Sequence, residues 1–226
     1  SSRIQLLLGN LQDMCMRNPD ISCQLKKIND NFDYIQRLIH TSSRDLSNLK
    51  NTLKECRILP LLESYISSFS SLPFGIDPMI NKERIDSDIR VKIDITLFTA
   101  MMDNILINAH RHGFDKKVSS ENKVSIELDV VQYGGVDHLM LSVRNNGKKM
   151  EEGFSVYDYI SRGKHGKRTG NTGQGGYDIY QIVKNFNGYL GLRSDAQWNF
   201  IIEILIPVIG TDSETLNTPY PYGTLL

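Results

Sequence analysis

Two asparagines spaced four residues apart could take part in metal and phosphate chemistry. Asn104 and Asn108 lie in residues 96–112, whose apolar spacing predicts a helix, so their side chains share one helix face. Asparagine is unfavourable inside a helix, and its amide oxygen is a suitable hard ligand for Mg²⁺. Arg111, three residues after Asn108, lies on the same side and could contact a phosphate. The alternative is a polar helix face without a ligand.

A second polar motif lies where a predicted strand runs into a loop. Asn145 and Asn146 come just after this strand, and Gly147 follows them. A polar side chain at a strand end, followed by glycine, can present a hydrogen-bond acceptor to a planar base. The alternative is an ordinary turn, because Asn-Gly is a common turn dipeptide.

A glycine-rich segment opens the last predicted helix. Its residues are Gly170, Asn171, Thr172, Gly173, Gln174, Gly175, Gly176 and Tyr177. Such a backbone presents free N–H groups to an anion at the helix N-terminus, and Lys164, Lys167 and Arg168 add positive charge before it. No GKS or GKT follows the glycines, so the segment is not a P-loop, and a long loop precedes it, which excludes a Rossmann motif. The alternative is a flexible loop without a special role.

The pattern of apolar residues predicts a mixed sheet-and-helix domain that positions these motifs. Helices are expected at residues 59–69, 96–112 and 177–186, and strands at 89–93, 124–130, 139–143, 189–193 and 198–206. Pro73, Gly75 and Pro78 are expected to break the chain after the first helix, and Pro207 to close the last strand. Mostly antiparallel strands with helices on one face make an α+β two-layer sandwich.

The first quarter of the chain predicts a helical hairpin. Its apolar residues follow a seven-residue repeat that is typical of the seam of a coiled coil or bundle. The repeat consists of Leu25, Ile28, Phe32, Ile35, Ile39, Ser42, Leu46, Leu49 and Leu53. This helix is expected from about Ile21 to about Cys56, after a shorter one. This helix would be about 54 Å long, whereas the shorter helix would be about 22 Å long. Its far half therefore needs a second subunit or residues upstream of Ser1 to cover its apolar side chains.

Length and composition fit a globular protein of one or two domains. The 226 residues include 26 basic and 26 acidic side chains, and 40% are hydrophobic. Zero net charge argues against a general nucleic-acid binder, and no apolar run approaches the roughly 20 residues that cross a bilayer. The three cysteines lack metal-site spacing and are interpreted as reduced cytosolic thiols.

Taken together, the three motifs resemble the ATP-binding domain of sensor histidine kinases, a branch of the GHKL ATPase superfamily. Residues 104–109 are similar to the N box, NLLxNA. Residues 145–147 are similar to the first glycine box, DxGxG, and residues 173–179 to the second, GTGLGL. The resemblance covers nearly all of residues 1–207. It implies a helical-hairpin dimerisation bundle followed by a two-layer sandwich of the Bergerat ATPase fold.

The resemblance also implies a role for each position. Asn108 would bind the Mg²⁺ that bridges the ATP phosphates, and Asn104 would stand at the position of the catalytic base. The other cofactor-binding positions are Arg111, Asn145, Gly147, Lys164, Thr172, Gly173, Gly175 and Gly176. Among these, Asn145 takes the place of the adenine-binding aspartate. Phe154 and residues 157–160 would form the aromatic part of a lid.

The chain departs from the family pattern at both glycine boxes. Asn145 replaces an aspartate, so a hydrogen bond to the exocyclic amine of adenine loses its charge assistance, which roughly halves its strength. Lys149 replaces the second glycine of the first box, where it would crowd the base. The second box has Gly176-Tyr177-Asp178 in place of Leu-Gly-Leu. The departures bear on nucleotide affinity and rate.

The implied reaction is transfer of the ATP γ-phosphoryl group to a histidine, and then to an aspartate on a response-regulator receiver domain. No phosphoacceptor motif is found here. His40 lies beside the seam of the second predicted helix, so the acceptor is expected upstream of this chain. Two alternatives are a GHKL ATPase switch without histidine transfer and a pseudokinase that serves as a dimeric scaffold.

The expected organisation has three parts. A helical hairpin truncated at its N-terminus covers residues 1–58, an ATP-binding domain covers residues 59–210, and a flexible tail covers residues 211–226. The hairpin is expected to form a homodimer. We expect no nucleic-acid partner and no membrane-spanning segment within the chain. The expected location is cytoplasmic, either as a separate protein or as the cytoplasmic part of a larger receptor attached to the membrane.

Overall fold

The computed structural model describes residues 53–67, 75–80, 85, 88–114, 121–161, 174–210 and 225–226. The chain divides into two compact units, Ser1–Arg44 and Asp45–Leu226, and every described residue belongs to the second. The predicted helical hairpin, with His40, lies outside the described residues. The same holds for residues 162–173, which include Lys164, Thr172 and Gly173.

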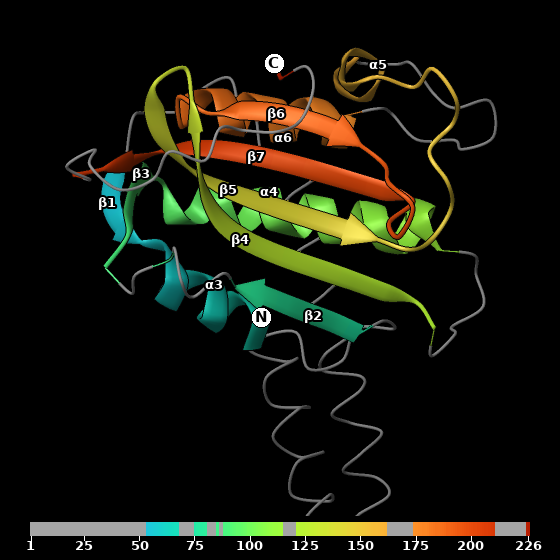
Figure 1. Ribbon diagram of the computed structural model, residues 1–226, viewed down its shortest axis with the longest axis horizontal. Helices are drawn as coiled ribbons and strands as arrows, with labels where there is room; N and C mark the ends of the chain where they lie inside the picture. The colour runs from blue at the N-terminus through green and yellow to red at the C-terminus, as the bar shows by residue number, and fades with distance from the viewer. Residues whose placement is uncertain are drawn as a thin grey trace, which may run out of the picture. The chain divides into compact units, whose positions relative to one another are not determined.

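A seven-stranded sheet forms one layer of this unit (Figure 1). Its strands are β1 Lys54–Arg57, β2 Gly75–Ile80, β3 Arg90–Ile93, β4 Lys123–Tyr133, β5 Val136–Asn145, β6 Tyr189–Arg193 and β7 Phe200–Ile209. The order is β1-β3-β7-β5-β4-β2, and β6 also pairs with β7. Only the β2–β4 pair is parallel among these strands. Strand β7 pairs with β5 along one edge and with β6 and β3 along the other.

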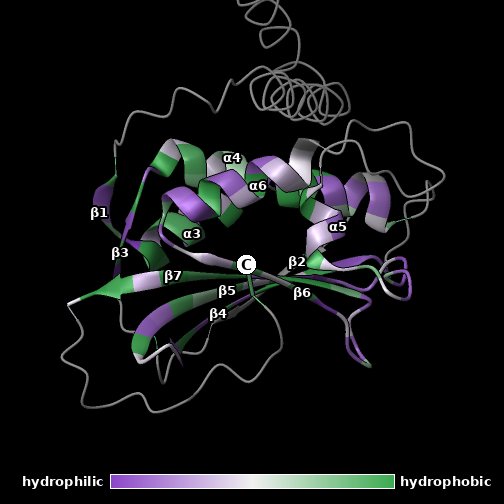
Figure 2. Ribbon diagram, turned by 90° about the horizontal axis from the view of Figure 1, so that it is seen from above, coloured by the Kyte–Doolittle hydropathy of each residue, from purple (hydrophilic) through white to green (hydrophobic). Residues whose placement is uncertain are grey.

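Helices form the second layer, and Figure 2 shows α3, α4 and α6 together on one side of the sheet. The helical elements are α3 Ile58–Ser67, α4 Ile95–Asn108, the π-helical turn η2 Ala109–Gly113, α5 Val156–Ile160 and α6 Gln174–Asn185. Asp94 begins α4 as its N-cap, because its Oδ1 accepts hydrogen bonds from the N–H groups of Thr96 and Leu97 at 2.8 and 3.0 Å. None of the helices described is long and apolar enough to cross a membrane.

The core lies between the two layers. Alternate residues of β4 and β5 are fully or almost fully buried, as expected for strands with one face against helices. These residues are Val124, Ile126, Leu128, Val130, Leu139, Leu141 and Val143. They share one apolar cluster with Phe98, Met101 and Ile105 of α4 and with Ile179, Ile182 and Val183 of α6. The predicted α+β two-layer sandwich is therefore confirmed for the described unit.

The predicted helix ending near Cys56 is wrong at its C-terminal end. Residues Lys54–Arg57 form β1, which pairs antiparallel with β3. Leu53 fits the seven-residue repeat, but it packs against the core of the sheet unit. A single apolar residue at helical spacing carries little information at an element boundary. Pro60 lies in the first turn of α3, where proline is tolerated.

Two further differences involve proline in edge or terminal positions. Strand β2 contains Pro78 and was expected to be a break, but β2 is the outer strand of the sheet, where a missing N–H is tolerated. Strand β7 continues beyond Pro207, because Val208 and Ile209 gain a new partner in β3. The structure also contains α5, a five-residue helix within the segment that was expected to be a loop.

Candidate functional site

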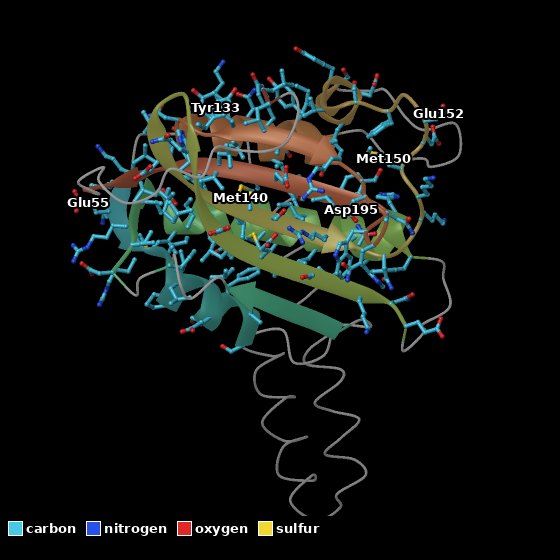
Figure 3. The ribbon with its side chains drawn as sticks, viewed as in Figure 1. Glu55, Tyr133, Met140, Met150, Glu152 and Asp195 are labelled. Atoms are coloured by element: carbon cyan, nitrogen blue, oxygen red, sulfur yellow. The ribbon has the colours of Figure 1, made fainter. Side chains whose placement is uncertain are left out.

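The predicted site residues gather where β5 ends and where α4 and α6 meet. Figure 3 shows Met150 and Glu152, which follow β5, at the opposite end of the sheet from Tyr133, the last residue of β4. Two groups of residues lie here. We call one the helix cluster, made of Asn104, Asn108, Tyr159, Gly175 and Gly176. We call the other the strand-end turn, made of Gly113, Asn145, Asn146 and Gly147.

Asn108 is the central residue of the helix cluster. It is the last residue of α4, and its Nδ2 donates a hydrogen bond to the hydroxyl of Tyr159 at 3.3 Å. The amide oxygen takes no part in this bond. No described residue donates a hydrogen bond to the remaining atom, Oδ1. An amide oxygen in this state suits Mg²⁺, which binds through one or two protein oxygens and completes its shell with phosphates and water.

Asn104 lies one turn earlier on α4, and both asparagines are partly exposed. Residues four apart lie on the same helix face, so the two amides share a face as predicted. Three or more His, Cys, Asp or Glu side chains in a metal-binding arrangement are not found among the described residues. A cation at this face would therefore depend on amide oxygens and on its own non-protein ligands.

The glycines at the start of α6 allow close approach to this pair. A Cβ atom at Gly176 would lie 2.1 Å from the carbonyl oxygen of Tyr159. A Cβ atom at Gly175 would lie 3.4 Å from Asn108 Nδ2 and 3.6 Å from its Oδ1. The first distance excludes any side chain, whereas the second is an ordinary contact. The second glycine motif thus places the start of α6 against Asn108 and Tyr159.

Tyr159 is held by the short helix α5. Ser155 begins this helix with a capping box, in which its hydroxyl accepts from the N–H of Asp158 and the carboxylate of Asp158 accepts from the N–H of Ser155. The Tyr159 ring also contacts Phe200, with ring centroids 6.0 Å apart. Burial raises the pKa of the Tyr159 hydroxyl to about 12, although the hydrogen bond from Asn108 opposes this rise. The hydroxyl is therefore neutral near pH 7.

Asn145 is the central residue of the strand-end turn. It is the last residue of β5, only 5% of its surface is exposed, and its Oδ1 accepts a hydrogen bond from the N–H of Gly147 at 3.1 Å. A Cβ atom at Gly113 would lie 3.1 Å from the same oxygen, so the amide packs directly against the Gly113 backbone. A Cβ atom at Gly147 would lie 1.9 Å from the carbonyl oxygen of Gly113. This turn therefore requires glycine at position 147.

The neighbouring polar residues fix this turn in place. Asn146 Oδ1 accepts from the N–H of Lys123, and its Nδ2 donates to the carbonyl of Glu121, both at 2.8 Å. Asn199 Nδ2 donates to the carbonyls of Asn146 and Gly147 at 3.3 and 2.7 Å. Asn146 and Asn199 are thus engaged with the backbone, and of the three asparagines Asn145 has the fewest bonds.

The structure places six of the predicted site residues in the two groups, four in the helix cluster and two in the strand-end turn. These are Asn104, Asn108, Asn145, Gly147, Gly175 and Gly176. The backbone of Arg111 lies in η2, between the two groups, but its side chain is outside the described part. Lys164, Thr172 and Gly173 also lie outside it, so their predicted roles stay predictions.

Sequence reasoning missed three residues of this region. Tyr159 was placed only within an aromatic stretch, and nothing in its spacing indicates that it bonds to Asn108. Gly113 was interpreted as the residue that ends a helix, although it also receives the Asn145 amide. Asn199 was not singled out. A possible signal was its position at the start of a strand that pairs with β5.

Comparison with known proteins gives a consistent result. No protein-family profile matches this chain. It is 26% identical over 151 residues to the sensor histidine kinase YvrG of Bacillus subtilis (strain 168). The match covers 66% of this chain but only 24% of that protein. The chain therefore corresponds to about a quarter of the curated relative.

Two solved structures show the same fold. The catalytic domain of histidine kinase ThkA, in a nucleotide-free form, matches with a TM-score of 0.53 and 17% identity, covering 69% of this chain and 95% of that one. The mycobacterial sensor histidine kinase MprB matches with a TM-score of 0.53 and 14% identity, covering 70% and 98%. The predicted resemblance to the C-terminal region of sensor histidine kinases, with its ATP-binding domain, is confirmed.

Proposed function

We propose that this chain, which has the fold of histidine kinase catalytic domains, binds a purine nucleoside triphosphate and donates its γ-phosphoryl group to a histidine. The resemblance implies ATP as this nucleotide. The observation that carries the proposal is the contact between Asn108 and Gly175, which belong to two motifs far apart in the sequence. Their meeting supports a single site for a metal-bound triphosphate.

In this proposal the helix cluster holds the phosphates. Asn108 would contribute its Oδ1 to Mg²⁺, since its hydrogen bond to Tyr159 uses Nδ2 and not that oxygen. The metal would neutralise charge on the phosphate oxygens. The start of α6 would contribute backbone N–H groups, which favour an anion at a helix N-terminus. Arg111, Lys164, Thr172 and Gly173 stay proposed phosphate contacts.

The chemistry of Asn104 favours transfer to histidine over hydrolysis. An amide is not a base, so Asn104 cannot take a proton from an attacking water. A neutral imidazole attacks with a nitrogen lone pair and does not need that base. The N–P bond forms as the bond between the γ-phosphorus and the bridging oxygen breaks, the nucleoside diphosphate leaves with the electron pair, and the ring proton passes to solvent.

Substitution of Asn108 tests the binding site directly. Asn108→Ala should abolish metal-dependent nucleotide binding in calorimetric titration. A matched control is Asn185→Ala at the end of α6, whose Nδ2 is buried and has no hydrogen-bond partner among the described residues. The control should bind like the native chain. Unchanged Mg-ATP affinity in Asn108→Ala would contradict the proposed role of this amide.

Incubation of the full-length protein with γ-labelled nucleotide separates the alternatives. Label on the protein that is released by acid but stable to base supports the histidine kinase. Free phosphate alone supports an ATPase switch, and the absence of any nucleotide binding supports a scaffold. The alternatives gain some support from Asn145 and Lys149, which depart from the family pattern on the base side.

The remaining parts of the proposal concern the whole protein. We expect a homodimer formed through the helical hairpin predicted before β1, an acceptor histidine upstream, and a response-regulator receiver domain as the partner that takes the phosphoryl group. The nucleotide-binding domain would cover residues 59–210, now extended to include β1. The proposed location is the cytoplasmic side, free or attached to a membrane receptor.

A further inference from the structure

The amide of Asn145 has a fixed orientation. Its Oδ1 accepts from the N–H of Gly147 at 3.1 Å, and only an oxygen can accept this bond. Rotation of the amide by 180° would bring two donors face to face, Nδ2 and the Gly147 N–H. Because 95% of the side chain is buried against its surroundings, including the Gly113 backbone, there is little room for other conformers. Nδ2 is therefore the free end of this amide.

No described residue accepts a hydrogen bond from Asn145 Nδ2. The whole residue is 5% exposed, but Nδ2 is not among the buried side-chain atoms of the described residues that lack a partner, so this donor can meet a ligand or water. The other two asparagines of the region differ in this respect. Asn146 and Asn199 each use their Nδ2 to donate to backbone carbonyls. Among these three asparagines, only Asn145, which the resemblance implies lies beside the base, has an Nδ2 without a described acceptor.

We propose that the base subsite selects a 6-oxopurine nucleoside triphosphate, the chemical class of ITP and GTP, over ATP. This inference rests on the proposed function and on the resemblance, which implies that Asn145 lies beside the purine. Guanine and hypoxanthine have an acceptor, O6, at the purine 6-position, whereas adenine has a donor, the N6 amine. Asn145 Nδ2 complements O6 and opposes N6. An aspartate at the same position has only acceptors when ionised and complements the adenine amine.

The neighbouring residues strengthen this polarity. Gly147 is followed by Lys148 and Lys149, both exposed, and their ammonium groups are donors only. The strand-end turn contains no carboxylate in Asn145, Asn146, Gly147 or Gly113 that could accept from an adenine amine. To bind adenine in the same pose, Asn145 would have to break its bond with Gly147 and turn its oxygen outward.

Calorimetric titration of the complete chain with Mg-ITP and Mg-ATP tests the inference. The two nucleotides differ only in the 6-position and the protonation of the adjacent N1. The native chain should bind ITP at least tenfold more tightly than ATP. Purine riboside triphosphate, which has a hydrogen at C6, should fall between them. This ranking in the native chain decides the matter even if no variant folds.

The substitution Asn145→Asp should reverse the preference, because the carboxylate keeps the bond from Gly147 and presents an acceptor to N6. Tighter binding of ATP than ITP by the native chain would overturn the base selectivity but leave the proposed function standing. No binding of any of these nucleotides, by either the native chain or Asn145→Asp, would overturn both. Reversal in the variant, together with ITP preference in the native chain, would support both.

Discussion

The helix cluster and the strand-end turn are built in similar ways but present opposite hydrogen-bonding groups. In each, an asparagine at the end of a secondary-structure element uses one amide atom for an internal bond, and glycine allows backbone to come close. Asn108 donates through its nitrogen to Tyr159 and leaves its oxygen without a described partner, whereas Asn145 accepts through its oxygen from Gly147 and leaves its nitrogen without one. The same residue type thus leaves an acceptor in one place, where the proposed function would put a cation, and a donor in the other.

This difference indicates that the two parts of the site can vary separately. The helix cluster retains the amide expected for a metal ligand, and its glycines fit the groups that they contact. The strand-end turn has the geometry of a glycine turn, but Asn145 has an amide where the family pattern has a carboxylate. The affinity for the metal-bound phosphates and the selectivity for the base should therefore respond to different substitutions. The experiments below test this independence.

The largest effect is expected from Gly147→Ala. Its Cβ would lie 1.9 Å from the carbonyl oxygen of Gly113, so the backbone must move, and the free energy of unfolding should fall by roughly 3 kcal/mol. Chemical denaturation measures this loss. Gly134→Ala is a useful control, because its Cβ meets nothing within 4 Å and it carries only the strain of a positive φ, about 1 kcal/mol. Equal losses in the two variants would contradict the steric explanation.

Two adjacent glycines in the helix cluster should differ from each other. Gly176→Ala places Cβ 2.1 Å from the Tyr159 carbonyl and should destabilise the chain by about 2 kcal/mol. Gly175→Ala makes an ordinary 3.4 Å contact with Asn108 and gains helix propensity, so stability should stay the same or rise by up to about 1 kcal/mol. Thermal unfolding of the two variants, side by side, provides the comparison. A loss of stability in Gly175→Ala as large as in Gly176→Ala would count against it.

Tyr159→Phe should give a smaller effect that is confined to the helix cluster. The change removes one hydrogen bond of 3.3 Å to Asn108, worth about 1 kcal/mol, and frees the amide to rotate. Affinity for metal-bound nucleotide should fall severalfold, by the same factor for ITP and ATP, because the lost hydrogen bond joins Tyr159 to Asn108 and not to the strand-end turn. Titrations of Tyr159→Phe, Asn145→Asp and the double variant should be additive. A change in base preference caused by Tyr159→Phe alone would refute the independence of the two parts.

The smallest effect concerns pH. Burial raises the pKa of Tyr159 to about 12, above its ordinary value of 10. The contribution of the neutral hydroxyl to stability is therefore fully present below pH 10 and is lost as the pH rises towards 12. Between pH 7 and 9 the ratio of nucleotide affinities of the native chain and Tyr159→Phe should stay constant. A ratio that changes steadily over this range would mean that the hydroxyl ionises earlier than its surroundings allow.

The sequence predicts the layers better than the contacts. Alternation along β4 and β5 and the periodicity of α4 are local patterns, so both were found from the residues alone. Strand β1 was taken for helix and β2 for a break, because their pairing partners lie far along the chain. The resemblance identified Asn108 and Asn145, but no local pattern indicates which amide atom each one leaves free. That depends on Tyr159 and on the Gly147 turn.

The bond between Tyr159 and Asn108 also sets a limit on mechanical communication within this unit. Helix α5 reaches the Asn108 amide through one hydroxyl, so the loss of this hydrogen bond alone would alter cation affinity by about 1 kcal/mol. About 1.4 kcal/mol corresponds to a tenfold change in an equilibrium. Through this bond, helix α5 would change the affinity for the cation gradually, by roughly one order of magnitude at most, and would not switch cation binding on or off.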